Sequence, residues 1–238
     1  MKHRTIRGKI LYTSLKEDRL NAERGRESFS ITQQSDNTVV LHAHCEIDDE
    51  PDVIRDVILA MNADSSPIDC SVRLTVGGKF EGSGWMVFDG NEARCETYNR
   101  QHGRLSQTLT TESPVRWLQA HPLAGDGLLM KLYDLTQGPG KTFFPELLLT
   151  SPDHRGATGP QLFKTGFGIR YVGEEPITVK AGQFKARHFQ VVDTAGNLPE
   201  EHPPYDVWVH SDNYLLLKAQ VGGYMQTHYE LVELEVIE

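Results

Sequence analysis

Apolar and polar side chains alternate in short runs from residue 5 to residue 111, and turn-forming residues separate these runs. A period of two is typical of β-strands, whose successive side chains point to opposite faces of a sheet. The clearest run covers residues 70–76, and Gly77-Gly78 after it supplies the positive φ angles of a tight hairpin turn. Gly82 and Gly84 in the next run indicate a bulge or a close backbone approach. The pattern predicts a long antiparallel meander.

Residues 39–48 form the run with the densest grouping of ionisable side chains. As a strand, this run has an apolar face made of Val39, Leu41, Ala43, Cys45 and Ile47. Its opposite face carries His42, His44, Glu46 and Asp48. An imidazole close to a carboxylate can accept a proton near neutral pH and return it elsewhere. His42, His44 and Glu46 are therefore the candidate catalytic residues.

Two other interpretations of His42 and His44 stay open. Their i, i+2 spacing on a strand lets two imidazoles bind one metal ion. A cupin-like iron or zinc motif, however, begins with a glycine, has a glutamate where Asp48 or Asp49 lies, and has a second half, all of which are absent. Solvent-facing or structurally hydrogen-bonded histidines are the simpler alternative. The sequence predicts no metal and no cofactor, and it leaves open whether the protein is an enzyme.

The pattern changes at Ser113-Pro114, a pair that suits the first turn of a helix. Two short helices are predicted, over residues 115–121 and 127–135. The second is very apolar, and such a helix beside a long sheet packs across the concave face, where it buries surface worth ~25 cal/mol per Å². One domain over residues 1–238 is therefore predicted. Its parts are a β-meander (5–111), a helical insert (113–136) and the C-terminal strands (147–236).

Residues 151–160 form the least ordinary loop of the chain. An acid, an imidazole and a guanidinium follow one another in it: Asp153, His154 and Arg155. A loop can bring such groups to the mouth of a pocket, where Arg155 would bind an anionic group. The alternative is a polar turn whose side chains satisfy local backbone groups. Further candidate ligand-binding residues lie far away along the chain, namely Tyr205, His210 and His228.

Composition and charge narrow the classes of partner. The chain has 24 basic and 33 acidic residues and a formal net charge of −9, which opposes binding to the phosphate backbone of nucleic acids. No window of about eighteen apolar residues appears, so no membrane span is predicted. The N-terminus lacks the apolar segment of a secretory signal. Three cysteines without CxxC spacing favour buried free thiols. We therefore expect a cytoplasmic protein, and a homodimer stays open.

The C-terminal third resembles a known family. The segments that carry the similarity are residues 177–189 (ITVKAGQFKARHF), 205–209 (YDVWV) and 214–219 (YLLLKA). They are similar to strands of bacterial proteins related in shape to the LolA lipoprotein carrier, and the similarity covers residues 163–235. The resemblance implies a curved antiparallel sheet that wraps around helices and leaves an apolar cavity. It implies no catalytic residue, because such motifs mostly encode sheet geometry.

Together these observations predict a mainly β protein of one domain. Its long curved antiparallel sheet, or half-open barrel, would hold one or two short helices on the concave face. The predicted function is cytosolic binding of a hydrophobic or aromatic small molecule in the cavity of this sheet. The alternative is a cofactor-independent lyase, isomerase or hydrolase that acts on such a molecule, with His42 or His44 as the general base.

Overall fold

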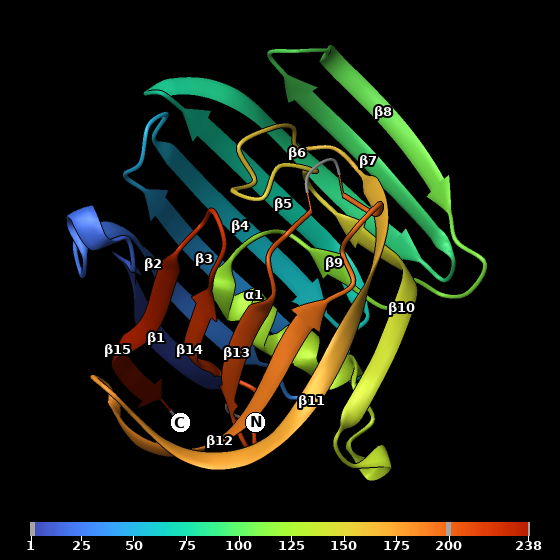
Figure 1. The fold of residues 1–238 in the computed structure, drawn as a ribbon. Helices are drawn as coiled ribbons and strands as arrows, with labels where there is room; N and C mark the ends of the chain where they lie inside the picture. Colours follow the sequence, from blue (N-terminus) through green and yellow to red (C-terminus); the bar gives the residue numbers. More distant parts are fainter. Residues whose placement is uncertain (1–2, 199–200, 238) are drawn as a thin grey trace.

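The computed structural model describes residues 3–198 and 201–237. In this part of the chain, fifteen strands form one curved sheet that does not close into a barrel (Figure 1). The strands are β1 (Arg4–Ser14), β2 (Glu23–Gln33), β3 (Val39–Ile47), β4 (Val53–Met61), β5 (Pro67–Val76), β6 (Lys79–Asp89), β7 (Glu92–Asn99), β8 (Gly103–Thr110), β9 (Leu118–Gln119), β10 (Gly140–Leu149), β11 (Phe163–Val179), β12 (Gly182–Val192), β13 (Tyr205–His210), β14 (Leu216–Val221) and β15 (Thr227–Ile237). The prediction of a mainly β, half-open barrel is confirmed.

The order of the strands follows from the meander. It runs from β8 back to β1, continues through β15, and then runs from β14 back to β9. Adjacent strands are antiparallel, apart from β9, which lies parallel to β10. The pairing of β1 with β15, from Thr5 opposite Ile237 to Ser14 opposite Thr227, joins the two halves of the sheet. Strands β8 and β9 are therefore its edges.

A short apolar helix fills the concave side of the sheet (Figure 1). Helix α1 (Leu123–Leu129) continues directly into a 3₁₀ turn, η2 (Met130–Leu132), and most of its side chains are buried. Gly127 allows a close approach, because a Cβ there would lie 2.6 Å from the oxygen of Tyr214 and 2.8 Å from the nitrogen of Leu216. The prediction that an apolar helix packs across the concave face is confirmed.

The core lies between this helix and the inward side of the strands. In β3, Leu41, Ala43 and Cys45 are buried, whereas His42 between them is exposed. Cys70 and Cys95 are also buried, and the three thiols are unpaired, as the prediction of buried free thiols requires. None of the helices in the described segments has the length and apolar character needed to cross a bilayer.

Some boundaries differ from the predictions. The helix expected over residues 115–121 is wrong, because Leu118 and Gln119 form β9 and pair with Leu148 and Leu149. The second helix, expected over residues 127–135, begins four residues earlier, at Leu123, and its α-helical part ends at Leu129. Pairing with β10 holds Leu118 and Gln119 in an extended backbone, and Leu118 and the preceding Trp117 are both buried. Two further 3₁₀ turns are η1 (Glu17–Arg19) and η3 (Leu135–Gln137).

The glycine predictions agree with the backbone. Gly77 and Gly78 have φ angles of 58° and 66° in the β5–β6 hairpin. At Gly82 a Cβ would clash with the carbonyl oxygen of Gly159, so the absent side chain makes room for the loop between β10 and β11. This loop crosses the open side of the sheet in Figure 1. Most of residues 151–160 are buried or half-buried there, whereas His154 and Thr158 are exposed.

Candidate functional site

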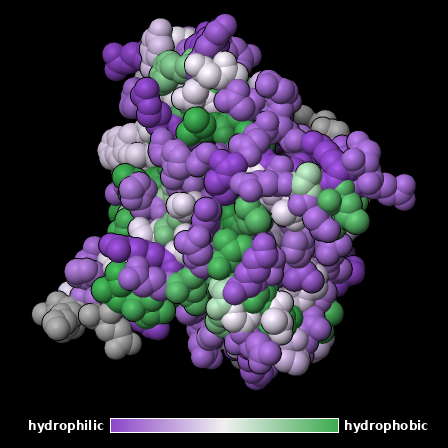
Figure 2. Space-filling view, turned by 90° about the vertical axis from the view of Figure 1, so that its left-hand side faces the viewer, coloured by the Kyte–Doolittle hydropathy of each residue, from purple (hydrophilic) through white to green (hydrophobic). Residues whose placement is uncertain are grey.

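Two adjoining cavities lie at the end of the sheet that carries the β1–β2, β3–β4 and β14–β15 connections. The outer chamber has a volume of about 470 Å³ and a charged lining that includes Arg24, Asp49, Arg55 and Arg155. The inner chamber, of about 130 Å³, is mostly apolar. The two share His121, Leu123, His154, Met225 and Tyr229. Hydrophilic residues cover most of the side that carries the β1–β2 connection, with hydrophobic patches between them (Figure 2).

Positive charge exceeds negative charge in the outer chamber. Four arginines line it, Arg19, Arg24, Arg55 and Arg155, against two acids, Asp49 and Glu50. Asp49 accepts hydrogen bonds from Arg19 Nη1 at 2.8 Å and from Arg24 Nε at 2.6 Å. Burial raises the pKa of Asp49, but these two hydrogen bonds outweigh burial and hold the pKa below its usual value. Asp49 is thus ionised and balances only part of the positive charge.

Arg55 and Arg155 are the arginines with unused hydrogen-bonding capacity. Arg55 is 3% exposed and donates to the carbonyl oxygens of Arg155 at 2.5 Å and His121 at 3.2 Å. Among the described residues, neither its buried Nε nor the buried Nε of Arg155 has a hydrogen-bond acceptor. The nearest acid to Arg155 Nε is Asp153, with Oδ1 at 3.9 Å. A buried donor without an acceptor is costly, so a ligand with an acceptor oxygen would relieve it.

A row of three buried side chains on adjacent strands binds the start of α1 and the loop that contains Arg155. Glu27, Cys45 and Arg55 lie opposite one another on β2, β3 and β4, on the face that α1 covers. Glu27 accepts hydrogen bonds from the backbone N–H groups of Leu123 at 2.7 Å and Ala124 at 2.9 Å. Burial raises the pKa of Glu27, and the two backbone hydrogen bonds oppose this effect. Glu27 therefore caps the start of α1, where the backbone donors lack helical partners.

The inner chamber has its own polar group. Asp126 of α1 accepts hydrogen bonds from Tyr205 Oη at 2.8 Å and from Gln119 Nε2. Burial raises the pKa of Asp126 to about 7. His121 lies at the boundary between the chambers, and burial together with the charge of Arg55 lowers its pKa to about 3. Its neutral ring donates from Nε2 to the oxygen of Ser151 at 3.1 Å.

Four of the six candidate ligand-binding residues line the two chambers, and the other two do not. Arg155 lines the outer chamber, Asp153 and Tyr205 line the inner one, and His154 lines both. Asp153 Oδ1 also accepts from the backbone N–H of Arg155 at 3.0 Å, so the polar-turn interpretation describes part of this loop. His210 and His228 lie elsewhere. His210 lines a cavity at the opposite end of the sheet, and His228 lies between two residues that line the chambers, so it faces outward.

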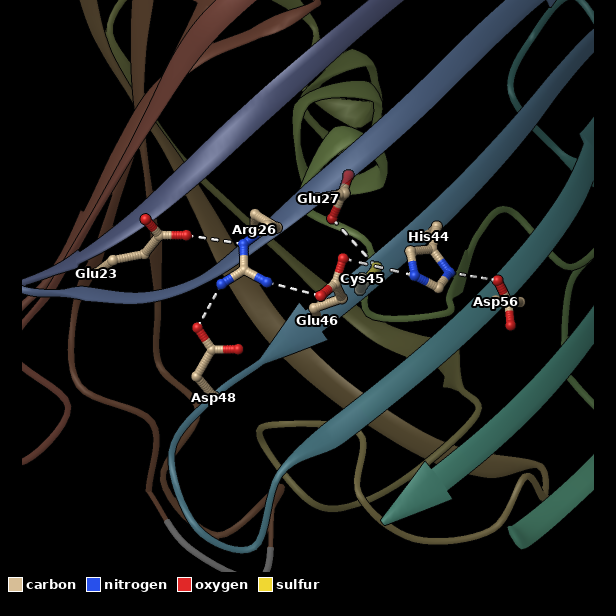
Figure 3. Close-up of polar contacts among 8 residues, drawn as sticks. All are labelled: Glu23, Arg26, Glu27, His44, Cys45, Glu46, Asp48 and Asp56. Carbon is tan, nitrogen blue, oxygen red and sulfur yellow. Dashed lines mark hydrogen bonds and ion pairs between the residues drawn. The ribbon is translucent and has the colours of Figure 1, made fainter. Parts of the chain in front are cut away.

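The candidate catalytic residues lie on the outer face of the sheet, away from both chambers. Figure 3 shows Arg26 between Glu23, Glu46 and Asp48, and His44 between Glu46 and Asp56. His44 Nδ1 is 2.6 Å from Asp56 Oδ1. His42 lies over a shallow outer groove. In the described segments, no three potential metal-ligating side chains gather. The ionisable face of β3 is therefore a surface network of hydrogen bonds and ion pairs.

Replacing both histidines, as His42→Ala and His44→Ala, is expected to change the free energy of unfolding by less than about 1 kcal/mol. Exposed ion pairs contribute little, and the His44 and Asp56 side chains are 44% and 47% exposed. Ligand affinity in the chambers should also be unchanged. Urea denaturation and calorimetric titration of the double variant measure both quantities. A large loss of affinity would instead assign these residues to a site on the outer face.

Glu27, Arg55 and Asp126 were missed by the sequence analysis. Glu27 and Arg55 each occupy a position where the alternation of their strand places apolar neighbours, since Phe29 and Val57 share their faces. A charged residue in the inward register of a strand is the signal that identifies such groups. Asp126 carries no comparable signal, because a seven-residue helix is too short to define its faces.

Comparison with solved structures supports the fold through a β-barrel-like protein. No protein-family model matches the chain, and no curated protein matches its sequence. The crystal structure of a β-barrel-like protein of the domain of unknown function DUF1849 from Brucella abortus is similar over 99% of this chain and 98% of that chain, at 11% identity and a TM-score of 0.57. A structure of MucB in complex with MucA(peri) covers 98% of this chain and 50% of that chain, at 11% identity and a TM-score of 0.30, too low to carry an argument. The chain therefore has a curved, β-barrel-like fold similar to that of the DUF1849 protein.

Proposed function

We propose that the protein binds a small amphipathic molecule in the two chambers, with an apolar or aromatic group in the inner chamber and an anionic group in the outer one. The observation that carries this proposal is Arg155, whose buried Nε finds no acceptor within residues 3–198 and 201–237, in a chamber lined by more cations than anions. This refines the predicted ligand, a hydrophobic or aromatic small molecule, by adding a negative charge.

The electrostatics favour an anion over a neutral ligand. The whole protein has a net charge of −9, yet the outer chamber concentrates four guanidinium groups. Clefts with low-dielectric walls focus such a field and raise the local concentration of oppositely charged ligands. A guanidinium matches the two oxygens of a carboxylate with paired donors. A carboxylate is therefore the anionic group that we propose.

The size of the inner chamber limits the apolar group. Its volume of about 130 Å³ is similar to that of an engineered apolar cavity of about 150 Å³ that holds benzene. Leu129, Phe167, Val191 and Val221 supply apolar walls. An aromatic ring or a short branched chain fits this volume, whereas a long acyl chain does not.

Catalysis is the second candidate, and Asp126 is the observation that favours it. This carboxyl group lines the inner chamber, and its pKa of about 7 suits proton transfer near neutral pH. Both of its oxygens, however, already accept hydrogen bonds from Tyr205 and Gln119. Binding therefore remains the preferred function. A cytosolic setting stays part of the proposal, on the three unpaired cysteines.

Replacing Arg155 by glutamine is expected to weaken the binding of 4-phenylbutyrate at least tenfold, because a charge-assisted hydrogen bond contributes about 1.5–3 kcal/mol. The affinity for 4-phenylbutan-1-ol, which lacks the charge, should change less than twofold. Isothermal titration calorimetry measures both affinities.

The matched control is Arg104→Gln on the outer face, where the side chain is 83% exposed. It should bind both compounds like the unmodified protein. Equal loss of acid and alcohol affinity in the Arg155 variant would show a general packing defect, and unchanged affinity for the acid would contradict the assigned role of Arg155.

A further inference from the structure

A third cavity, of about 590 Å³, lies at the opposite end of the sheet, where β1 begins and β15 ends (Figure 1). It is lined by the start of β1 at Arg4, the end of β15 at Val236, and the connections around Asn37 and Asp212. It shares no lining residue with the outer or inner chamber. Helix α1 and its 3₁₀ extension separate this cavity from the inner chamber. Asp126 and Leu129 line the inner chamber, whereas Leu128 and Lys131 line this cavity.

The walls of this terminal cavity are largely apolar. They include Ile6, Ile31, Val39, Leu128, Leu215 and Leu234. The ring of Phe184 lies edge to face with that of His210, with centroids 5.9 Å apart. His210 Nδ1 accepts a hydrogen bond from the backbone N–H of Asp212 at 3.1 Å, so the imidazole forms a fixed part of the wall. A volume of this size lies within the range of sites that hold ligands of drug-like size.

Lys131 is the cation inside this cavity. Its side chain is half-buried, and burial lowers its pKa. In the described part of the chain, Lys131 Nζ has neither a hydrogen-bond acceptor nor an ion-pair partner, whereas lysines such as Lys164 and Lys185 pair with glutamates. Arg4 and Asp212, the other charged residues of the lining, are exposed. An ammonium among apolar walls is stabilised by an anion, since burial without a partner penalises its charged form.

We propose that the terminal cavity is a second binding site, for a single-chain fatty carboxylate whose head group pairs with Lys131 and whose chain lies against the apolar walls. The site is independent of the two chambers at the other end. The terminal cavity is also larger than the inner chamber. Its volume is more than four times as great, 590 against 130 Å³, and therefore accepts a long chain. Its cation is a single ammonium rather than a group of guanidinium groups.

The test is calorimetric titration of the full chain with dodecanoate and, separately, with dodecan-1-ol below its solubility limit. Unmodified protein should bind dodecanoate at least tenfold more tightly than the alcohol. Lys131→Met should bind dodecanoate at least tenfold more weakly and leave 4-phenylbutyrate binding unchanged, whereas Lys131→Arg should retain dodecanoate binding. The control, Lys79→Met at the exposed start of β6, should bind like unmodified protein.

Lys131→Met removes a charge that has no partner, so the variant should unfold at the same urea concentration as unmodified protein or higher. Equal dodecanoate affinity in Lys131→Met and unmodified protein would overturn the proposal. Loss of dodecanoate binding in Arg155→Gln with retention in Lys131→Met would overturn it as well, since the fatty carboxylate would then occupy the outer chamber. Neither result changes the expectation for 4-phenylbutyrate, so the two sites are tested separately.

Discussion

Glu27→Gln is expected to lower the free energy of unfolding by about 3 kcal/mol, because the amide cannot accept both backbone hydrogen bonds at the start of α1. One of its ends is a donor, so it would face the N–H of Leu123 or Ala124 and leave a buried donor unsatisfied. The substitution also removes the carboxylate that lies in one row with the buried Arg55. Urea denaturation followed by circular dichroism measures the change.

Glu23→Gln on the same strand is the matched control. Glu23 pairs with Arg26 on the outer face, and its side chain is 48% exposed, so this substitution should cost less than about 1 kcal/mol. Equal destabilisation by the two substitutions would show that the buried row contributes no more than a surface ion pair. Such a result would contradict the role of Glu27 as the cap of α1.

His121 and Asp126 are expected to produce opposite dependences of stability on pH. The pKa of His121 is about 3 in the folded state and about 6.5 when unfolded, so the unfolded state binds more protons between these values and stability rises with pH. The pKa of Asp126 is about 7 in the folded state and 3.8 when unfolded. Here the folded state binds more protons, so stability falls as pH rises from about 4 to 7.

Each group accounts for about three pKa units, or about 4 kcal/mol, so the two nearly cancel in the unmodified protein. Relative to it, His121→Asn should lose up to about 3 kcal/mol of stability between pH 4 and pH 6.5, because Asp126 then acts alone. Asn suits position 121, where φ is 73°. Asp126→Asn should gain stability over the same range.

Urea denaturation at half-unit pH steps measures these differences, and subtraction of the unmodified protein removes the contribution of other titrating groups. If the free energy of unfolding changes with pH in the same way in both variants and the unmodified protein, the predicted opposite contributions of His121 and Asp126 are wrong. If both variants gain stability with pH relative to the unmodified protein, or both lose it, one of the two residues does not titrate as its buried position requires.

The β-structure follows closely from the sequence because alternation is a local signal. Residues 53–61, which lie within the predicted meander, form β4, and their burial alternates along the strand. Residues 115–121 were misassigned, because the pairing of β9 with β10 is set by contacts between segments about thirty residues apart. Propensity cannot report such a contact.

The candidate site illustrates a different limit. Alternation correctly separated the two faces of residues 39–48, but the density of ionisable groups drew attention to the face that is outside the sheet. The cavities lie on the apolar face, where Glu27 and Arg55 interrupt the apolar register. The loop residues Asp153, His154 and Arg155 were identified because three ionisable groups in succession are visible without any tertiary information. That Asp153 and His154 line the same chamber as Tyr205 depends on the path of the chain across the open side of the sheet.

The central claim is that the chambers bind an amphipathic anion, and the position of such a ligand tests it most directly. A crystal of the full chain grown with 4-(4-bromophenyl)butyrate should give an anomalous bromine peak in the inner chamber, between Phe167 and Val191, with the carboxylate within hydrogen-bonding distance of Arg155. The account would be contradicted if, in a crystal saturated with this compound, the bromine lay on the outer face of the sheet and both chambers held only water.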